Sequence, residues 1–299
     1  MSGDLCVVDI TALLFRAYFG KMRRKAPNGV EVGAVWGTLM ILRKIFDKYP
    51  PKRVAFVFDS PGDTFRTEID DSYKANRGAP PEDLEPQFGI VFELCKAMGV
   101  RCFIDSRYEA DDFMASLAVQ ARRANVGCLL FSTDKDINQL VVDESPTVVR
   151  IDIHKDKVHD EQAVFDKMGV FPAAVVDFQA LVGDSVDNIA GVRGVGAKSA
   201  AAVINHFSSL DSLYDSLDEV SKMTIRGAKS LQMKLKTGRD DAYLSRSLVL
   251  LKDDIDLQLS DLAMDLKWQK PLDGAEDAFM HWGLSRYLIQ IEEACMGGG

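Results

Sequence analysis

The sequence predicts an α/β fold with a mostly parallel central sheet flanked by helices, followed by an all-helical region. Two observations lead to this prediction. Short apolar runs typical of buried strands alternate with longer segments of helical periodicity up to His159, and only helical segments follow that residue. Strands that alternate with helices form parallel sheets with right-handed crossovers. In such sheets, ligands bind beyond the carboxyl ends of the strands.

The length and composition are those of a globular protein. The chain has 299 residues, 47% of them hydrophobic, which is enough for a full core. No apolar run is long enough to span a membrane, so we expect no membrane association. No signal-peptide pattern precedes the first predicted strand. We therefore expect a cytoplasmic protein, at the nucleoid if the source is bacterial, or an organellar protein from which a transit peptide has been removed.

The cysteines show no paired spacing. This favours buried thiols in a reducing compartment over disulfides or a zinc site. The five residues are Cys6, Cys95, Cys102, Cys128 and Cys295.

The predicted elements follow one another with few long connections. We expect Thr11 to cap the first helix. The polar segment around residues 61–81 has little hydrophobic periodicity, which is typical of a disordered stretch or a functional lid. The predicted strands span residues 5–9, 53–59, 100–104, 126–131 and 147–153. The other predicted helices span residues 32–49, 84–98, 160–168, 172–182 and 200–206, and one more begins at Glu109.

Acidic residues follow several of the predicted strands. Asp9 and Asp59 each end a strand, and Asp134 and Asp136 follow another. Glu109 opens the acidic start of a helix, which by itself could be a solvated, self-capped N-terminus. Because the carboxyl ends of parallel strands meet at one edge of a sheet, we expect these acids to converge.

The convergence of so many acids predicts a site for divalent metal ions. Asp184 and Asp187, three residues apart, can face the same way on a helical turn and join the others. Carboxylates packed in a partly desolvated cleft repel one another, so cations must compensate them. With no His or Cys among them, two or more Mg²⁺ or Mn²⁺ ions are expected. The predicted ligands are Asp9, Asp59, Glu109, Asp111, Asp112, Asp134, Asp136, Asp184 and Asp187.

A glycine-rich segment, residues 191–199, separates two predicted helices. It is not a phosphate-binding P-loop, because Ala197 separates Gly196 from Lys198 and no strand precedes it. Its backbone N–H groups, next to Arg193 and Lys198, could hold a nucleic-acid phosphate without reading sequence. An ordinary helical hairpin with glycines for tight turning would have the same sequence.

Basic residues are grouped although the net charge is −9. Residues 21–25 are KMRRK, and Arg66, Lys74 and Arg77 flank a second predicted basic patch. Residues 222–239 contain six basic residues and no acidic one. Basic stripes around an acidic centre suit a protein that holds phosphates. Solvated helix faces would give the same pattern.

Six motifs in this order resemble the 5′-nuclease domain of bacterial DNA polymerase I and its stand-alone relatives, the flap endonucleases of bacteria and phages. They include YKANR, YEADD and DKD, and the similarity runs from about residue 5 to residue 257. Ile10, Thr133 and Ala190 depart from the family pattern, although all nine carboxylates are present. The motifs occupy residues 8–9, 58–59, 73–77, 108–112, 134–136 and 183–196.

The resemblance implies a fold and a division into domains. Residues 1–158 would form a PIN-like nuclease core with a mobile arch near residues 61–82. Residues 159–299 would form a helical DNA-binding region with C-terminal helices and a helix-three-turn-helix element, related to the helix-hairpin-helix, at residues 183–206. This element would hold duplex DNA, and in this family it often carries a K⁺ ion.

The resemblance also implies residue roles. Lys74 and Arg77 would reach the scissile phosphate from the arch, with Arg16 and Tyr73 positioning it. Asp9, Asp59 and the acids of residues 109–112 would hold one metal, and the remaining four acids would complete the second. With the basic residues noted above, the expected DNA-binding residues are Gly191, Arg193, Gly194, Gly196, Lys198, Ser199, Lys234 and Lys236.

These features together predict a monomeric, metal-dependent 5′→3′ exonuclease and flap endonuclease. It would cut DNA, including RNA-primed strands, at junctions of single strand and duplex. The alternative is a catalytically weak junction-binding protein on the same fold. A binder of a polyanion would gain by losing the acids. A phosphatase with an Asp nucleophile is disfavoured, because Asp9 is followed by Ile10 and Thr11 rather than by an Asp two residues later.

Replacement of both Lys234 and Lys236 by Ala should weaken DNA binding equally for all sequences. Each lost phosphate contact also flattens the salt dependence, so the log–log slope should fall by roughly 1.8 for two contacts. Fluorescence anisotropy over a salt series measures this slope. The matched control replaces Lys267 and Lys270, and an equal change in that variant would contradict the assignment.

Overall fold

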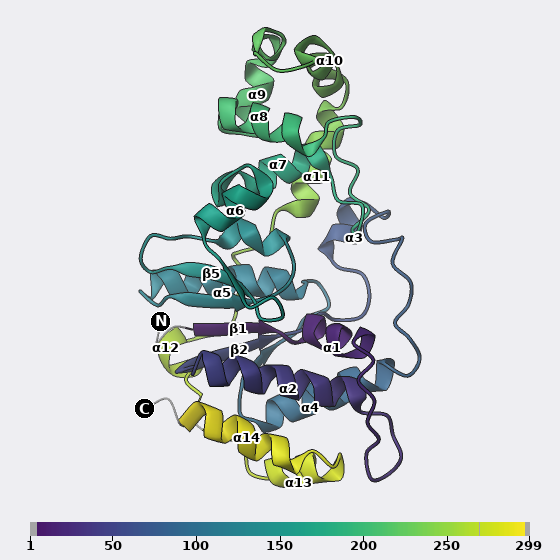
Figure 1. Ribbon diagram of the computed structural model, residues 1–299, viewed down its shortest axis with the longest axis vertical. Coiled ribbons are helices and arrows are strands. Elements are labelled where there is room, and N and C mark those ends of the chain that lie inside the picture. Colours follow the sequence, from purple (N-terminus) through teal and green to yellow (C-terminus); the bar gives the residue numbers. More distant parts are fainter. Residues whose placement is uncertain (1–4, 269, 297–299) are drawn as a thin grey trace.

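A six-stranded sheet forms the centre of the N-terminal part of the molecule (Figure 1). The computed structural model describes residues 5–268 and 270–296. The strand order is β3-β2-β1-β4-β5-β6, in which β6 is antiparallel to β5 and the other pairs are parallel. The strands are β1 (Leu5–Asp9), β2 (Arg53–Val57), β3 (Arg101–Phe103), β4 (Cys128–Phe131), β5 (Val148–Asp152) and β6 (Lys157–His159).

The predicted mostly parallel sheet is confirmed, with strands up to two residues shorter at either end than expected. The short edge strand β6 was not predicted, because its three residues carry no periodic apolar signal. Strands β1, β4 and β5 are buried along their whole length. Such strands are mostly apolar because helices cover both faces of a parallel sheet, and the exceptions here are Asp9, Arg150 and Asp152.

Alternate residues of β1 face two different cores. Cys6 and Val8 pack with α1 (Ile10–Phe19), α2 (Gly33–Lys48) and α4 (Glu85–Ala97). Leu5 and Val7 pack on the other face, against α5 (Ala110–Arg123). This alternation is the period-two side-chain pattern of a strand.

The start of α1 differs from the prediction. Asp9, and not Thr11, is its N-cap, and the Asp9 carboxylate accepts a hydrogen bond from the backbone N–H of Ala12 at 2.8 Å. Thr11 lies within the helix, and its hydroxyl accepts the backbone N–H of Asp59 at 2.9 Å. Thr11 therefore joins the carboxyl ends of two neighbouring strands instead of capping a helix.

The helical region has its own apolar core. The predicted helix 172–182 begins with a 3₁₀ turn, Pro172–Ala174, and the helix predicted at 200–206 begins three residues earlier. The helices are α6 (Glu161–Met168), α7 (Val175–Val182), α8 (Ala197–Phe207), α9 (Leu210–Asp215), α10 (Ala228–Thr237) and α11 (Arg239–Val249).

The chain after α11 returns to the sheet, where the backbone N–H of Val54 in β2 donates to the carbonyl oxygen of Leu266 at 2.9 Å. Leu251 and Ile255 pack with α5. The short α12 (Leu262–Asp265) follows, and α13 (Ala275–His281) and α14 (Ser285–Met296) then pack under α2 and α4 (Figure 1).

Three of the described cysteines match the expectation of buried thiols. Cys6, Cys95 and Cys128 are buried, whereas Cys102 is partly exposed. The side chain of Cys295 lies outside the described residues. None of the described helices is both long enough and apolar enough to cross a bilayer.

Candidate active site

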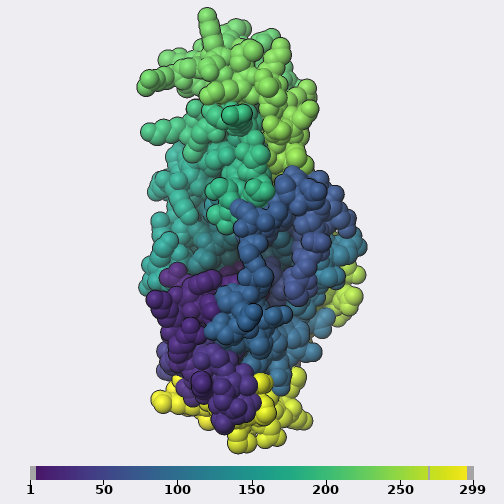
Figure 2. Space-filling model, turned by 90° about the vertical axis from the view of Figure 1, so that its right-hand side faces the viewer, coloured from purple at the N-terminus to yellow at the C-terminus, as the bar shows by residue number. Residues whose placement is uncertain are grey.

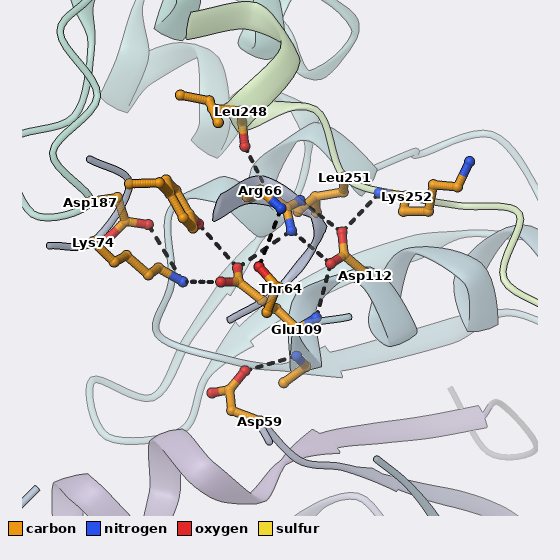
Figure 3. Close-up of polar contacts among 12 residues, drawn as sticks. Asp59, Thr64, Arg66, Lys74, Glu109, Asp112, Asp187, Leu248, Leu251 and Lys252 are labelled. Atoms are coloured by element: carbon orange, nitrogen blue, oxygen red, sulfur yellow. Dashed lines mark hydrogen bonds and ion pairs between the residues drawn. The ribbon is translucent and has the colours of Figure 1, made fainter. Parts of the chain in front are cut away.

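The predicted acids converge at the carboxyl ends of the central strands. Asp9 ends β1, Asp59 follows β2, and Asp134 follows β4. The N-terminus of α5 lies at the same edge, since the Asp59 carboxylate accepts the backbone N–H of Ala110 at 2.9 Å (Figure 3). The free N–H groups and dipole of this helix favour nearby negative charge.

A first group of acids around Asp9 lies close enough for strong mutual repulsion. Burial, followed by the charges of Asp59 and Asp134, raises the pKa of Asp9 to about 8. Burial and then the Asp134 and Asp9 charges raise the pKa of Asp111 well above its usual value. Burial, opposed by the Ala110 hydrogen bond, also raises the pKa of Asp59. Burial and mutual repulsion therefore make it costly to keep all of these carboxylates charged without compensating cations.

A second group brings Asp136, Asp184 and Asp187 together. One oxygen of each lies within 4.8 Å of the others, and all three residues are buried. Burial and the neighbouring Asp134 raise the pKa of Asp136 to about 7. Because Asp134 acts on both groups, the two groups form one continuous acidic centre.

The loop that carries Asp184 depends on a glycine. Gly183 has a φ of 74°, and a Cβ there would lie 2.5 Å from the carbonyl oxygen of Ile189. Asp184 and Ile189 exchange two backbone hydrogen bonds at 2.8 and 2.7 Å. This tight turn holds both Asp184 and Asp187 against Asp136.

Cations of the arch, residues 61–82, face the acids. The Lys74 ammonium lies 2.7 Å from Glu109 Oε1 and 3.9 Å from Asp187 Oδ2 (Figure 3). Arg77 is also ion-paired with Asp187, and the Tyr73 hydroxyl donates to Glu109 at 3.1 Å. Burial lowers the pKa of Lys74, but Glu109 and Asp187 outweigh it and raise the pKa above its usual value.

Asp112 makes different contacts from the other acids. It is fully buried, and each of its oxygens accepts a guanidinium N–H of Arg66 at 2.7 Å (Figure 3). The backbone N–H groups of Glu109 and Lys252 donate to the same carboxylate at 3.0 and 2.9 Å. Four donors therefore occupy Asp112, a predicted metal ligand, which leaves its oxygens poorly suited to direct contact with an ion.

Arg66 is not part of a basic surface patch, which corrects the prediction. Its side chain is 1% exposed and lies in the short helix α3 (Phe65–Ile69). Besides Asp112, it donates to the carbonyl oxygens of Leu248 at 2.8 Å and Leu250 at 3.2 Å. The arch predicted to be irregular is thus anchored at its base to α5 and to the end of α11.

The other residues predicted to bind DNA lie on several different elements. Arg16 is exposed on α1, and Tyr73, within the arch, is buried. Lys234, on α10, donates to the carbonyl oxygen of Gly194 in the predicted hairpin at 2.8 Å. Lys236 is exposed on the same helix. In the hairpin, Gly191 is buried, Ser199 is partly exposed, and the exposed members are Arg193, Gly194, Gly196 and Lys198.

Three supporting residues were missed by the sequence analysis. Gln179 donates to Asp136 at 2.6 Å, and Lys135 lies 2.9 Å from Asp184. Arg150 is 1% exposed and donates to Asn138 at 2.8 Å and to the Ser132 carbonyl at 3.2 Å. It therefore braces the loop that carries Asp134 and Asp136. The one signal in the sequence for Arg150 was that a basic residue stood within an apolar, strand-like run.

Comparison with known proteins identifies the family of the chain. Residues 4–169 match a family model described as 5′-3′ exonuclease, N-terminal resolvase-like domain, and residues 170–272 match the model of its C-terminal SAM fold. The chain belongs to the 5′-3′ exonuclease family. The predicted resemblance is confirmed, and residues 273–299 lie beyond both matches.

The chain matches both long relatives, of which it covers a small part, and short relatives, of which it covers nearly all. It is 37% identical over 282 residues to DNA polymerase I of Rhizobium leguminosarum, covering 91% of this chain and 26% of that protein. It is 33% identical over 268 residues to the 5′-3′ exonuclease of Buchnera aphidicola subsp. Acyrthosiphon pisum, covering 88% of this chain and 92% of the relative. The chain thus spans about a quarter of the DNA polymerase I relatives.

Solved structures share the fold of this exonuclease-family chain. The T5 D15 protein co-crystallised with metal ions superposes with a TM-score of 0.69 at 21% identity, over 99% of this chain and all of that one. The catalytic core of Rad2 in complex with DNA gives a TM-score of 0.61 at 18% identity, over 98% of this chain and 91% of that one.

The raised pKa values predict how metal and pH act on stability. The carboxyls of Asp9 and Asp136 titrate near 8 and 7 in the folded protein, above the ordinary value of 3.8. The stability that these two carboxyls contribute to the folded protein is fully present below about pH 4. It is lost progressively as pH rises from about 4 through 7 to 8. The melting temperature of the metal-free protein should therefore fall over this range.

Saturating Mg²⁺ or Mn²⁺ should raise the melting temperature more at pH 8 than at pH 5, by about 5–10 °C at a hundredfold excess over Kd. Differential scanning fluorimetry with and without chelator measures both effects. Asp111→Asn should reduce both the pH slope and the metal-dependent rise. An unchanged metal response in that variant would contradict this account of the site.

Proposed function

We propose that this chain is a metal-dependent 5′→3′ exonuclease and flap endonuclease that hydrolyses DNA at junctions of single strand and duplex. The observation that supports it best is a buried acidic centre at the carboxyl edge of the sheet, faced by Lys74 and Arg77 of the arch. Membership of the 5′-3′ exonuclease family supports the same reaction.

The donors in the acidic centre fit hard divalent ions. The ligand atoms are carboxylate oxygens, which Mg²⁺ and Mn²⁺ prefer. Asp9, Asp59, Asp111 and Asp134 would hold one ion, and Asp136, Asp184 and Asp187 a second. Divalent ions at paired sites of this kind activate water and neutralise the charge on the leaving oxygen. Burial and, after it, mutual repulsion raise the carboxyl pKa values, and both favour the binding of such ions.

The chain's own residues orient the substrate. Lys74 and Arg77 are paired with Glu109 and Asp187, and they would transfer these contacts to the phosphate as the acids bind cations. Tyr73 holds Glu109, and Arg16 would contact the neighbouring phosphate. In this proposal Asp112 is a positioning residue: through Arg66 it fixes the arch relative to α5.

The helical region would hold the duplex. Arg193, Lys198 and the N–H groups at the start of α8 would contact backbone phosphates. A K⁺ ion is proposed among the hairpin carbonyls, where the Lys234 ammonium already binds Gly194. We propose that the protein acts as a monomer, since the acids and the cations that face them all belong to one chain. Its substrates would include RNA-primed 5′ strands.

Asp134→Ala should slow cleavage severely while leaving the fold intact, because the charge of Asp134 acts on both groups of acids. A 5′-labelled flap substrate with Mg²⁺ should be cut about 10²–10³-fold more slowly, the size of effect seen when one electrostatic group is removed from an active site. Asp166→Asn, an exposed acid on α6, is the matched control and should be unaffected.

Persistent cleavage by Asp134→Ala would refute the assigned role of the acids. Absence of cleavage by the wild type, together with tight junction binding, would favour the alternative of a catalytically weak binding protein.

Lys74→Ala should slow cleavage far more than it weakens binding. Its ammonium belongs with the reacting phosphate, and an interaction made mainly in the transition state lowers the rate without a matching loss of affinity. Single-turnover rates and anisotropy on the same flap separate these effects. Equal losses in rate and affinity would reduce Lys74 to a phosphate anchor.

A further inference from the structure

Helix α1 has one exposed face that leads away from the acidic centre. Its buried residues are Ile10, Thr11, Leu13, Leu14 and Ala17. The residues open to solvent follow helical spacing at Ala12, Phe15, Arg16 and Phe19. Since Asp9 caps this helix, the exposed face begins at the acids and ends at Phe19, about 15 Å away at 1.5 Å per residue.

Phe19, at the end of this face, is a large apolar side chain that is not packed into a core. Its side chain is 67% exposed, the largest fraction among the exposed large apolar residues of the described chain. The ring is stacked on Phe15 with centroids 6.3 Å apart and planes 10° apart. Phe15 in turn contacts Phe88 of α4 at 5.5 Å. Phe19 is therefore an aromatic surface supported from below and open above.

Positive charge surrounds this ring. Residues 16–25 contain five basic residues and no acidic one. Arg16, Lys21 and Lys25 are exposed, and in the described chain no carboxylate lies within 4.0 Å of their charged groups. Arg23 is held by Asp83, just after the arch, at 3.0 Å, which places the segment beside the arch. Figure 2 shows the purple N-terminal segment and the blue arch segment adjoining on one face.

We propose that this face of α1 binds the unpaired 5′ segment of the nucleic acid, with one base stacked on Phe19. The inference rests on the proposed function and adds to it a binding site a few nucleotides from the cut. An exposed aromatic ring among cations without ion-pair partners has the chemistry of a site for single-stranded nucleic acid. Every base can stack on the ring through its π-face, and every phosphodiester carries a negative charge that the cations attract. Recognition is therefore independent of sequence.

The experiment compares two substrates under conditions in which they stay intact, with Ca²⁺ in place of Mg²⁺. One is a duplex with a six-nucleotide 5′ overhang, and the other is the same duplex with a blunt end. Phe19→Ala should weaken binding of the overhang about fivefold or more, the lower end for loss of one base–aromatic stack. Binding of the blunt duplex should not change, and Phe19→Trp should retain full affinity.

A matched control is Phe171→Ala. This ring is 48% exposed and stacked on Phe165, but it lies between α6 and α7. The Phe171→Ala variant should bind both substrates as tightly as the wild type does. Melting temperatures should be unaffected by either substitution, because neither side chain fills a core.

Abasic substitutions along the overhang identify the stacked base. Removal of that base should weaken binding by the wild type as much as Phe19→Ala does, and the two changes together should cost no more than one. Equal affinity of wild type and Phe19→Ala for the overhang, or additive losses at every abasic position, would overturn the proposal. Failure of the proposed function would differ, as the wild type would neither prefer the overhang nor cut flaps with Mg²⁺.

Discussion

Mutual repulsion of buried carboxylates is the constraint on which this structure depends. Asp9, Asp111 and Asp136 all have raised pKa values because they are buried near one another. The fold tolerates this arrangement by placing compensating groups around it: the N-terminus of α5, Lys74 and Lys135. These contacts are the ones that divalent ions would replace, so the same repulsion that weakens the metal-free fold provides the driving force for metal binding.

The buried pair of Arg66 and Asp112 connects the acidic centre to the rest of the molecule. One guanidinium joins the base of the arch, the start of α5 and the chain leaving α11. Removal of either partner would leave a buried charge uncompensated, which is usually strongly destabilising. The base of the arch is therefore anchored, while its cations Lys74 and Arg77 face the acids.

The distribution of charge explains how a protein of net charge −9 can act on a polyanion. The acids of the acidic centre lie buried at one edge of the sheet, whereas cations lie exposed on α1, the hairpin and α10. A phosphate backbone would meet the cations first, and only the bond to be cut would reach the acids. The aromatic face of α1 continues this path for the unpaired strand.

The sequence by itself determined the parallel strands and the edge at which the acids meet, because strand periodicity and acids after strands are local signals, and six ordered motifs indicated the family by resemblance. It did not distinguish Asp111 from Asp112, which are neighbours in the chain but about 100° apart around α5. One faces the acidic centre and the other faces Arg66. Only the tertiary structure decided this, together with the burial of Arg66 and the packing of α13 and α14 against α2 and α4. Each depends on contacts between segments far apart in the chain, which no local pattern records. Arg66 and Asp112, for example, differ by 46 in residue number.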